Sequence, residues 1–170
     1  MVRRERQGEM VTNPNPNPVF DALAGAEVSY RVIRYGSVRS ASEAAKARGV
    51  EVADVVKTIV TRRGDNDYVF VLIPGDRTIS WPKLRKVLGV NRLSMPDAAT
   101  AKEVTGYERG TITPFGSVHP WPVIADERIE GRQITLGAGE HGMAIAVDAD
   151  AALKALNATL ADVTEPESAE

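Results

Sequence analysis

A single lysine, Lys57, stands in a largely aliphatic run of the sequence, residues 55–60. Burying its ammonium group costs free energy unless an anion or a hydrogen-bond acceptor meets it. One interpretation is that the side chain reaches from the end of a strand into water, as lysines commonly do. The other is that Lys57 binds an anionic group of a ligand in a pocket.

A glycine-rich loop supplies a second candidate for chemistry. Residues 105–116 contain three glycines, and residues 110–114 have the pattern G-x-x-x-P. Glycine lets the backbone approach a ligand closely, and proline fixes the shape of a loop. Successive N–H groups can then hold a carbonyl or phosphate oxygen without a side-chain acid or base. With Lys57, this loop predicts a pocket for a phosphate or an ester. Residues 136–139 suit a further wall of the pocket, although a β-turn explains them equally well.

Other chemistries find little support. The two histidines, His119 and His141, have no metal-ligand spacing between them, and the chain has no cysteine. Metal sites and thiol nucleophiles are therefore not expected. The sequence contains no G-x-S-x-G elbow and no phosphate-binding P-loop. We predict neither a metal nor a cofactor.

Composition indicates one globular domain. The chain has 170 residues, of which 43% are hydrophobic and 26% are charged, enough to bury a core. No apolar run approaches the ~18 residues of a membrane span, and no apolar segment follows the charged amino terminus as it would in a secretory signal. We therefore expect a cytoplasmic protein that does not associate with membranes.

Charge is unevenly distributed along the chain. The net charge of −2 argues against a protein that coats nucleic acid. Residues 57–92, however, contain eight basic and three acidic residues, whereas residues 140–170 contain seven acidic and one basic. Such polarity can make one face attractive to phosphates, and ordinary solvated surface is the alternative.

Periodicity and capping signals predict the elements that position these residues. Ser40 and Glu43 form an S-x-x-E capping box, and Gly49 and Gly89 suit helix ends. We expect helices at residues 19–24, 41–48, 81–88, 96–104 and 148–155, with a short turn at 52–56, and strands at residues 28–35, 58–62, 68–73, 92–95, 122–125, 133–136 and 143–147. This mixture predicts a single α/β domain with a mixed, mostly antiparallel sheet and flanking helices.

Domain boundaries follow from composition. Alternating Asn and Pro at residues 13–18 cannot continue a helix or a strand ladder. We therefore expect a disordered leader at residues 1–17, a folded domain at residues 18–164 and an acidic tail at residues 165–170.

Six segments in order resemble the YbaK/ProX family of aminoacyl-tRNA deacylases, which is related to the editing domain of bacterial prolyl-tRNA synthetase. The resemblance covers roughly residues 19–163 and rests on residues 56–60, 84–89, 105–116, 122–126, 137–139 and 151–156. It implies the fold of that editing domain. It also implies hydrolysis, in trans, of the ester between a non-cognate amino acid, such as Cys or Ala on tRNA(Pro), and the 3′-terminal adenosine.

The resemblance also implies the roles of particular residues. Lys57 matches the family's essential lysine, which holds the phosphate or ribose region of the substrate end, and the loop at residues 110–114 positions the ester. The implied catalytic set is Lys57, Gly110, Thr111, Ile112, Thr113 and Pro114. The implied substrate-binding set is Tyr35, Phe115, Gly116, Asp126, Gly137, Ala138 and Gly139.

The chain departs from the family at two positions. Ala144 stands where the inserted editing domains carry a histidine, and Gly137 stands where other members have a small hydroxyl residue. His141 is therefore given no catalytic role, and the amino acid removed is not predicted.

Editing by a second site has a physical rationale. A synthetase pocket gains only about 1–3 kcal/mol per methylene, too little to reject a smaller amino acid reliably. The expected partners are a tRNA acceptor end carrying a non-cognate amino acid and prolyl-tRNA synthetase. Two alternatives remain, a catalytically silent module that binds tRNA or nucleotide ends and a small-molecule ester hydrolase.

Overall fold

A computed structural model of the protein describes residues 3–4 and 17–167. Within these residues, strands and helices mix along the chain, which confirms the predicted α/β class. The helices are α1 (Pro18–Gly25), α2 (Ala41–Arg48), α3 (Trp81–Leu88), α4 (Ala98–Thr105) and α5 (Ala149–Ala155), with 3₁₀ turns η1 (Val52–Asp54) and η2 (Glu127–Ile129). The strands are β1 (Arg3–Arg4), β2 (Tyr30–Arg34), β3 (Lys57–Gly64), β4 (Asp67–Ile73), β5 (Arg77–Ile79), β6 (Val123–Asp126), β7 (Gln133–Gly137), β8 (Met143–Asp148), β9 (Thr159–Ala161) and β10 (Thr164–Pro166).

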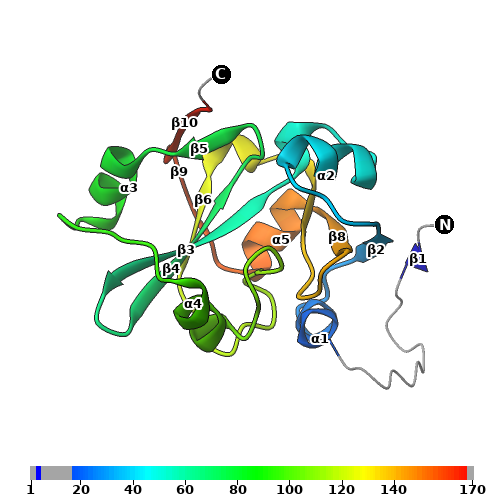
Figure 1. The fold of residues 1–170 in the computed structure, drawn as a ribbon, viewed down its shortest axis with the longest axis horizontal. Helices are drawn as coiled ribbons and strands as arrows, with labels where there is room; N and C mark the ends of the chain where they lie inside the picture. The colour runs from blue at the N-terminus through cyan, green and yellow to red at the C-terminus, as the bar shows by residue number, and fades with distance from the viewer. Residues whose placement is uncertain (1–2, 5–16, 168–170) are drawn as a thin grey trace.

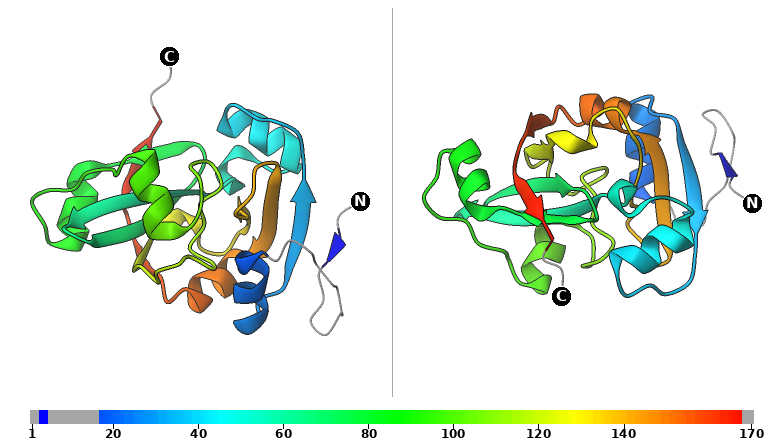
Figure 2. Two further views of the ribbon diagram at one scale, coloured as in Figure 1. Left: turned by 60° about the horizontal axis from the view of Figure 1, so that its bottom comes forward. Right: turned by 90° about the horizontal axis from the view of Figure 1, so that it is seen from above.

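Two four-stranded sheets make up most of the described fold, and they lie beside each other (Figures 1 and 2). The first has the order β1-β2-β8-β7 and is antiparallel throughout. The second has the order β3-β4-β6-β9, in which β3 and β4 form an antiparallel hairpin and the other two pairs are parallel. A small antiparallel sheet joins β5 to β10. The sheets are therefore mixed and mostly antiparallel, as predicted.

Helix ends follow the sequence signals. The Ser40 hydroxyl accepts a hydrogen bond from the Glu43 N–H at the start of α2, and Gly49 ends that helix at φ +73°. Ser80 caps α3 in the same way, and Gly89 ends it at φ +68°. A left-handed residue at the helix end turns main-chain N–H groups back toward the last free carbonyl groups of the helix, and glycine adopts that conformation without steric cost.

Some element predictions were wrong. The strand expected at residues 92–95 is reduced to a single bridge between Arg62 and Ser94. Arg92, Ser94 and Met95 are exposed, so this stretch lacks the half-buried face that favours a longer ladder. The sequence analysis missed the two-residue strand β1 and the three-residue strands β5, β9 and β10. Such short strands carry too few residues for a detectable alternation.

The leader expected at residues 1–17 lies outside the described residues, apart from residues 3–4 and 17. Arg3–Arg4 form β1 and pair with β2, so the expectation of disorder is wrong for these two residues. The last residue of the leader, Asn17, is buried and caps α1, and its side chain also donates to the Ala138 carbonyl at 2.9 Å. The acidic tail expected at residues 165–170 begins inside β10.

One apolar core joins the two large sheets. It combines side chains of the first sheet, such as Ile145, with side chains of the second, such as Phe70, and is closed by Leu23 of α1. Strand β4 is buried on both faces, since Val69 and Val71 pack on a second cluster with Leu84 of α3. Among the helices of the described part of the chain, none is long and apolar enough to cross a bilayer.

Candidate functional site

A cavity of about 450 Å³ opens between helix α2, the first half of β3, and the loop that follows α4. Its wall is contributed by segments far apart in the sequence. They are residues 38–41, 44, 48, 55–60, 95–96, 101, 109–110, 112 and 137. The cavity therefore brings together the lysine and the glycine-rich loop that the sequence analysis singled out.

Lys57 lies in the cavity wall at the start of β3. Its ammonium group donates a hydrogen bond to the main-chain carbonyl of Arg77 at 3.0 Å. An ammonium group has three N–H donors, and this contact uses one of them. The position of β3 is set across the two sheets, because the Val56 N–H donates to the Thr135 carbonyl of β7 at 2.9 Å.

The glycine-rich loop is held from behind by its own buried threonine and by the β7–β8 turn. The Thr111 hydroxyl donates to the Glu108 carbonyl at 2.7 Å, and the Thr111 carbonyl accepts from the Gly139 N–H at 3.0 Å. A Cβ atom added to Gly137 would lie only 3.0 Å from the Ile112 carbonyl oxygen. Glycine at position 137 thus lets the end of β7 approach the loop.

Some main-chain N–H groups of this loop have no partner within the protein. The N–H groups of Arg109, Gly110 and Ile112 donate no hydrogen bond to any of the described residues, and all three residues line the cavity. Gly110 has φ +90°, a conformation that favours glycine. Unpaired N–H groups at a cavity wall can stabilise an oxyanion or hold a phosphate oxygen.

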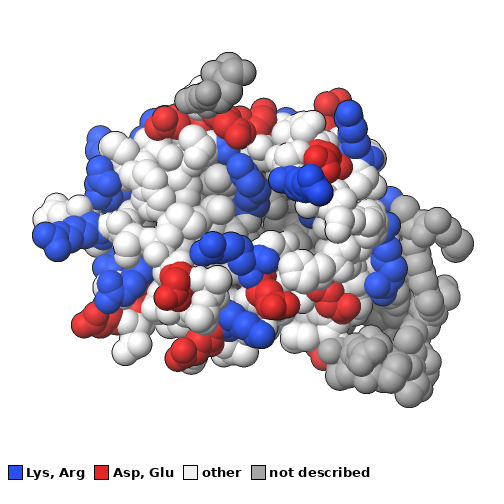
Figure 3. Space-filling view, viewed as in Figure 1, with Lys and Arg blue, Asp and Glu red and all other residues white. Residues whose placement is uncertain are grey.

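The charges of the cavity wall are all positive. The lining residues include Arg39, Arg48, Lys57 and Arg109, and no Asp or Glu is among them. In the space-filling view, Lys and Arg side chains border a hollow near the middle of the face (Figure 3). Such a concave basic site attracts anions and strengthens their binding by focusing the field.

Sequence reasoning missed three of these cations, Arg39, Arg48 and Arg109. Arg48 ends α2, where its guanidinium donates to the Tyr35 hydroxyl and to the Thr135 hydroxyl, both at 3.0 Å. It also stacks on the Tyr35 ring, 5.2 Å from the centroid. No spacing in the sequence links Arg48 to Lys57. Arg109 lies within the glycine-rich loop, and its charge beside Gly110 is the one signal in the sequence that points to it.

Several predicted site residues do not line the cavity. Tyr35 contacts it only through Arg48. Thr111, Thr113, Pro114 and Phe115 of the loop are buried, as is Ala138, and none of them lines the cavity. Gly116 and Gly139 pack against Tyr107, because a Cβ atom at either would lie within 3 Å of that side chain. Asp126 is fully buried in a separate polar cluster.

Tyr107 anchors the loop to the core. It is buried, and its hydroxyl donates to the Phe115 carbonyl at 2.7 Å. Burial raises the pKa of Tyr107 to about 12 because the phenolate form would lose its hydration. The tyrosine therefore stays a neutral donor across the physiological pH range.

Neither histidine lines the cavity. His141 is exposed, with Nε2 3.7 Å from the Glu108 carboxylate, and His119 packs beside Trp121. In the part of the chain that the structure describes, no group of three His, Asp or Glu side chains is placed to hold a metal ion.

Comparison with known proteins gives a consistent result. The aminoacyl-tRNA editing domain family matches residues 36–155. EbsC of Enterococcus faecalis, assigned as a Cys-tRNA(Pro)/Cys-tRNA(Cys) deacylase, is 31% identical over 129 residues, which are 75% of this chain and 79% of that protein. The proline–tRNA ligase of Lactobacillus helveticus is 36% identical over 97 residues, which are 56% of this chain and only 17% of the ligase.

Solved structures share the fold. A protein assigned as a trans-editing enzyme for prolyl-tRNA synthetase superposes with a TM-score of 0.76 at 24% identity, covering 89% of this chain and 99% of that one. The hypothetical protein APE2540 superposes with a TM-score of 0.80 at 23% identity, covering 87% of this chain and 99% of that one. At these identities the two structures support the fold alone.

Proposed function

The chain belongs to the aminoacyl-tRNA editing domain family, and we propose that it acts in trans to hydrolyse the ester of a mischarged tRNA, in the class of Cys- or Ala-tRNA(Pro). The observation that carries this proposal is the cavity itself. Lys57, Gly110 and Ile112, the last two with unpaired N–H groups, line the same cavity, and its wall carries four basic side chains and no acidic one.

The chain's own residues account for binding of the substrate end. Lys57, held by the Arg77 carbonyl, binds the phosphate or ribose region of the terminal adenosine, and Arg39, Arg48 and Arg109 add to the positive field. Because this binding displaces counterions from phosphates, it weakens as the salt concentration rises.

The loop accounts for the chemistry. The Gly110 and Ile112 N–H groups donate to the ester carbonyl oxygen as negative charge develops there. Water adds to the carbonyl carbon, the bond between that carbon and the ribose oxygen breaks, the ribose oxygen takes up the proton that the water gives up, and the amino acid leaves with a free carboxyl group. An activated ester in a fixed position needs little more than this stabilisation and a positioned water or substrate group. Thr111, Thr113, Pro114 and Phe115 support the loop from its buried side.

Partners and location extend the proposal. The curated proline–tRNA ligases contain a segment similar to this chain, so we propose that prolyl-tRNA synthetase passes its mischarged product to this protein. Both would then act in the cytoplasm, where charged tRNA is used.

Deacylation of mischarged tRNA tests the proposal. tRNA(Pro) charged with Cys or Ala is incubated with the wild type, with Lys57→Ala and with Lys102→Ala, a control that removes an exposed lysine of α4 outside the cavity. Loss of a hydrogen bond to a charged group predicts a rate about 10- to 100-fold lower for Lys57→Ala, and an unchanged rate for Lys102→Ala.

Each other outcome contradicts part of the proposal. Equal rates for the wild type and Lys57→Ala would remove Lys57 from the mechanism. Salt-sensitive tRNA binding without turnover on any charged tRNA would indicate a silent binding module. Hydrolysis of free aminoacyl esters as fast as of aminoacyl-tRNA would indicate a small-molecule hydrolase.

A further inference from the structure

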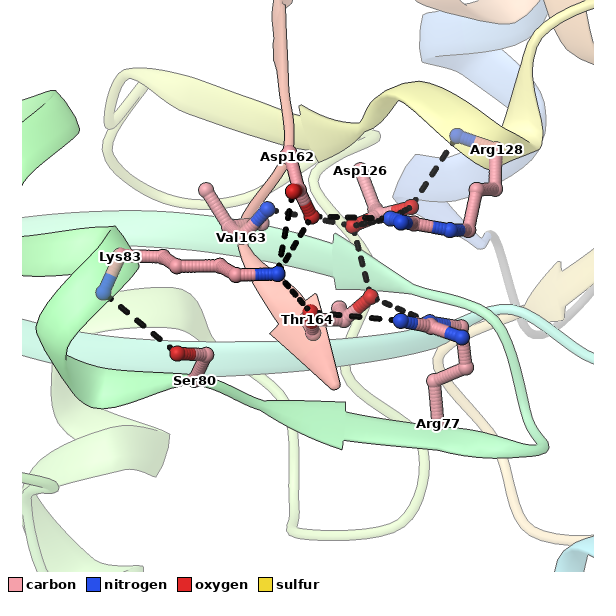
Figure 4. Close-up of polar contacts among 8 residues, drawn as sticks. All are labelled: Arg77, Ser80, Lys83, Asp126, Arg128, Asp162, Val163 and Thr164. Atoms are coloured by element: carbon pink, nitrogen blue, oxygen red, sulfur yellow. Dashed lines mark hydrogen bonds and ion pairs between the residues drawn. The ribbon is translucent and has the colours of Figure 1, made fainter. Parts of the chain in front are cut away.

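A buried polar cluster joins strands β5, β6 and β10 (Figure 4). At its centre, the Asp126 side chain is 0% exposed. It accepts hydrogen bonds from the Thr164 hydroxyl at 2.7 Å, from the Val163 N–H at 3.2 Å and from Arg128 Nη1 at 3.2 Å. A buried carboxylate requires such donors to offset its lost hydration, so Asp126 holds the C-terminal segment against β6.

The Thr164 hydroxyl is hydrogen-bonded to Arg77 as well as to Asp126. Because a carboxylate only accepts, the Thr164 O–H must donate to Asp126, and its lone pairs are left for another donor. Arg77 supplies that donor, with Nε 2.6 Å from the Thr164 hydroxyl oxygen and Nη2 3.3 Å from the Thr164 carbonyl oxygen. The side chain of Arg77 is thus fixed to β10.

The main chain of Arg77 in turn holds Lys57. Its carbonyl is the acceptor 3.0 Å from the Lys57 ammonium group. The turn before Arg77 is pinned from its other side, because a Cβ atom on Gly75 would lie 2.4 Å from the Val52 carbonyl oxygen. On the β10 side, the main chain of Arg77 belongs to the β5–β10 ladder, where Arg77 is in register with Pro166.

We propose that Thr164, backed by Asp126, is a positioning residue for Lys57 and acts through Arg77. The Thr164 hydroxyl fixes the Arg77 side chain, and the Arg77 carbonyl fixes the Lys57 ammonium group. Lys57 is thereby held in one position in the cavity wall. Strand β10 lies beyond residue 155, where the family match ends, so the match does not imply this role. The proposed effect on catalysis rests on the proposed function, whereas the effect on Lys57 does not.

Three variants test the chain of contacts. Thr164→Val removes the hydroxyl with little change in shape, Thr164→Ser keeps it, and Arg77→Met removes the guanidinium but keeps the carbonyl. Thr61→Val is the matched control, because Thr61 is also fully buried and its hydroxyl donates to the Val69 carbonyl outside this cluster.

The first readout is the NMR signal of the Lys57 ammonium group, which needs no substrate. Hydrogen bonding slows exchange of these protons with water. We expect the signal to be retained in the wild type, Thr164→Ser and Thr61→Val, and to broaden or shift in Thr164→Val and Arg77→Met. An unchanged Lys57 signal in folded Thr164→Val would overturn the proposal.

The second readout is a double-mutant cycle on deacylation of mischarged tRNA. Thr164→Val should lower the rate about tenfold in the wild-type background, consistent with one lost hydrogen bond to a charged group. In the Lys57→Ala background it should cause no further loss, because the side chain it positions is gone. Equal losses in both backgrounds would show a merely structural role. Absence of turnover in the wild type would overturn the proposed function and leave the NMR result to decide the positioning role.

Discussion

Replacing Tyr107 with Phe tests whether the glycine-rich loop depends on its anchor in the core. The Tyr107 hydroxyl donates to the Phe115 carbonyl at 2.7 Å, and the two residues are only 5% and 3% exposed. Removing the hydroxyl leaves that carbonyl buried without this donor. A buried unsatisfied group costs about 1–3 kcal/mol, so Tyr107→Phe should lower the free energy of unfolding by about that amount.

Urea denaturation at neutral pH measures this difference. Tyr68→Phe is the matched control, because Tyr68 is equally buried and its hydroxyl has no hydrogen-bond partner among the described residues. Its change should stay within about 0.5 kcal/mol, as for substitutions that disturb no buried contact. Equal losses in the two variants would refute the anchoring role of the Tyr107 hydroxyl.

The pH dependence of stability gives a second measurement on the same residue. Burial raises the pKa of Tyr107 from 10.0 to about 12. A raised pKa means that folding favours the protonated form, so this contribution is fully present below pH 10 and is lost as the pH rises through about 12. Wild-type stability should therefore fall over this range more steeply than that of Tyr107→Phe. Parallel curves would contradict the assignment.

Two further predictions concern the loop contact and the charged surface. Gly137→Ala places a Cβ atom 3.0 Å from the Ile112 carbonyl oxygen and 3.1 Å from the Thr111 carbonyl oxygen, so it should destabilise the fold by about 1–3 kcal/mol and slow deacylation. Gly25→Ala is the control and should do neither, because no atom lies within 4 Å of its new Cβ. Normal activity of Gly137→Ala would show that the loop tolerates displacement. Hydrogen bonds from Arg128 and then Lys83 lower the pKa of Asp162. The contribution of Asp162 to stability is therefore present above its unfolded pKa of about 4 and is lost as the pH falls below it. Acid denaturation of Asp162→Asn should lack this component, and superimposable acid titrations of the wild type and the variant would exclude it.

The candidate site could be predicted from the sequence only in part. Lys57 and the G-x-x-x-P loop are unusual within their own segments, so local inspection found both. Asp126 was expected to bind substrate because it stands in a segment that resembles the family. Its burial depends on Val163 and Thr164, which are 37 and 38 residues further along the chain, and no local pattern reports such contacts.

The sequence by itself determined the helix caps, the buried strands and the two segments that carry the proposed chemistry. These features depend on residues within a few positions of one another, through side-chain hydrogen bonds at helix starts, left-handed glycines at helix ends and apolar runs in strands. Only the tertiary structure decided which cations share the cavity with Lys57 and which carbonyl holds its ammonium group. Arg48 enters from α2, Arg109 from the loop after α4, and the Arg77 carbonyl from β5. Their proximity results from the packing of two sheets around one core, and packing is a property of the whole chain.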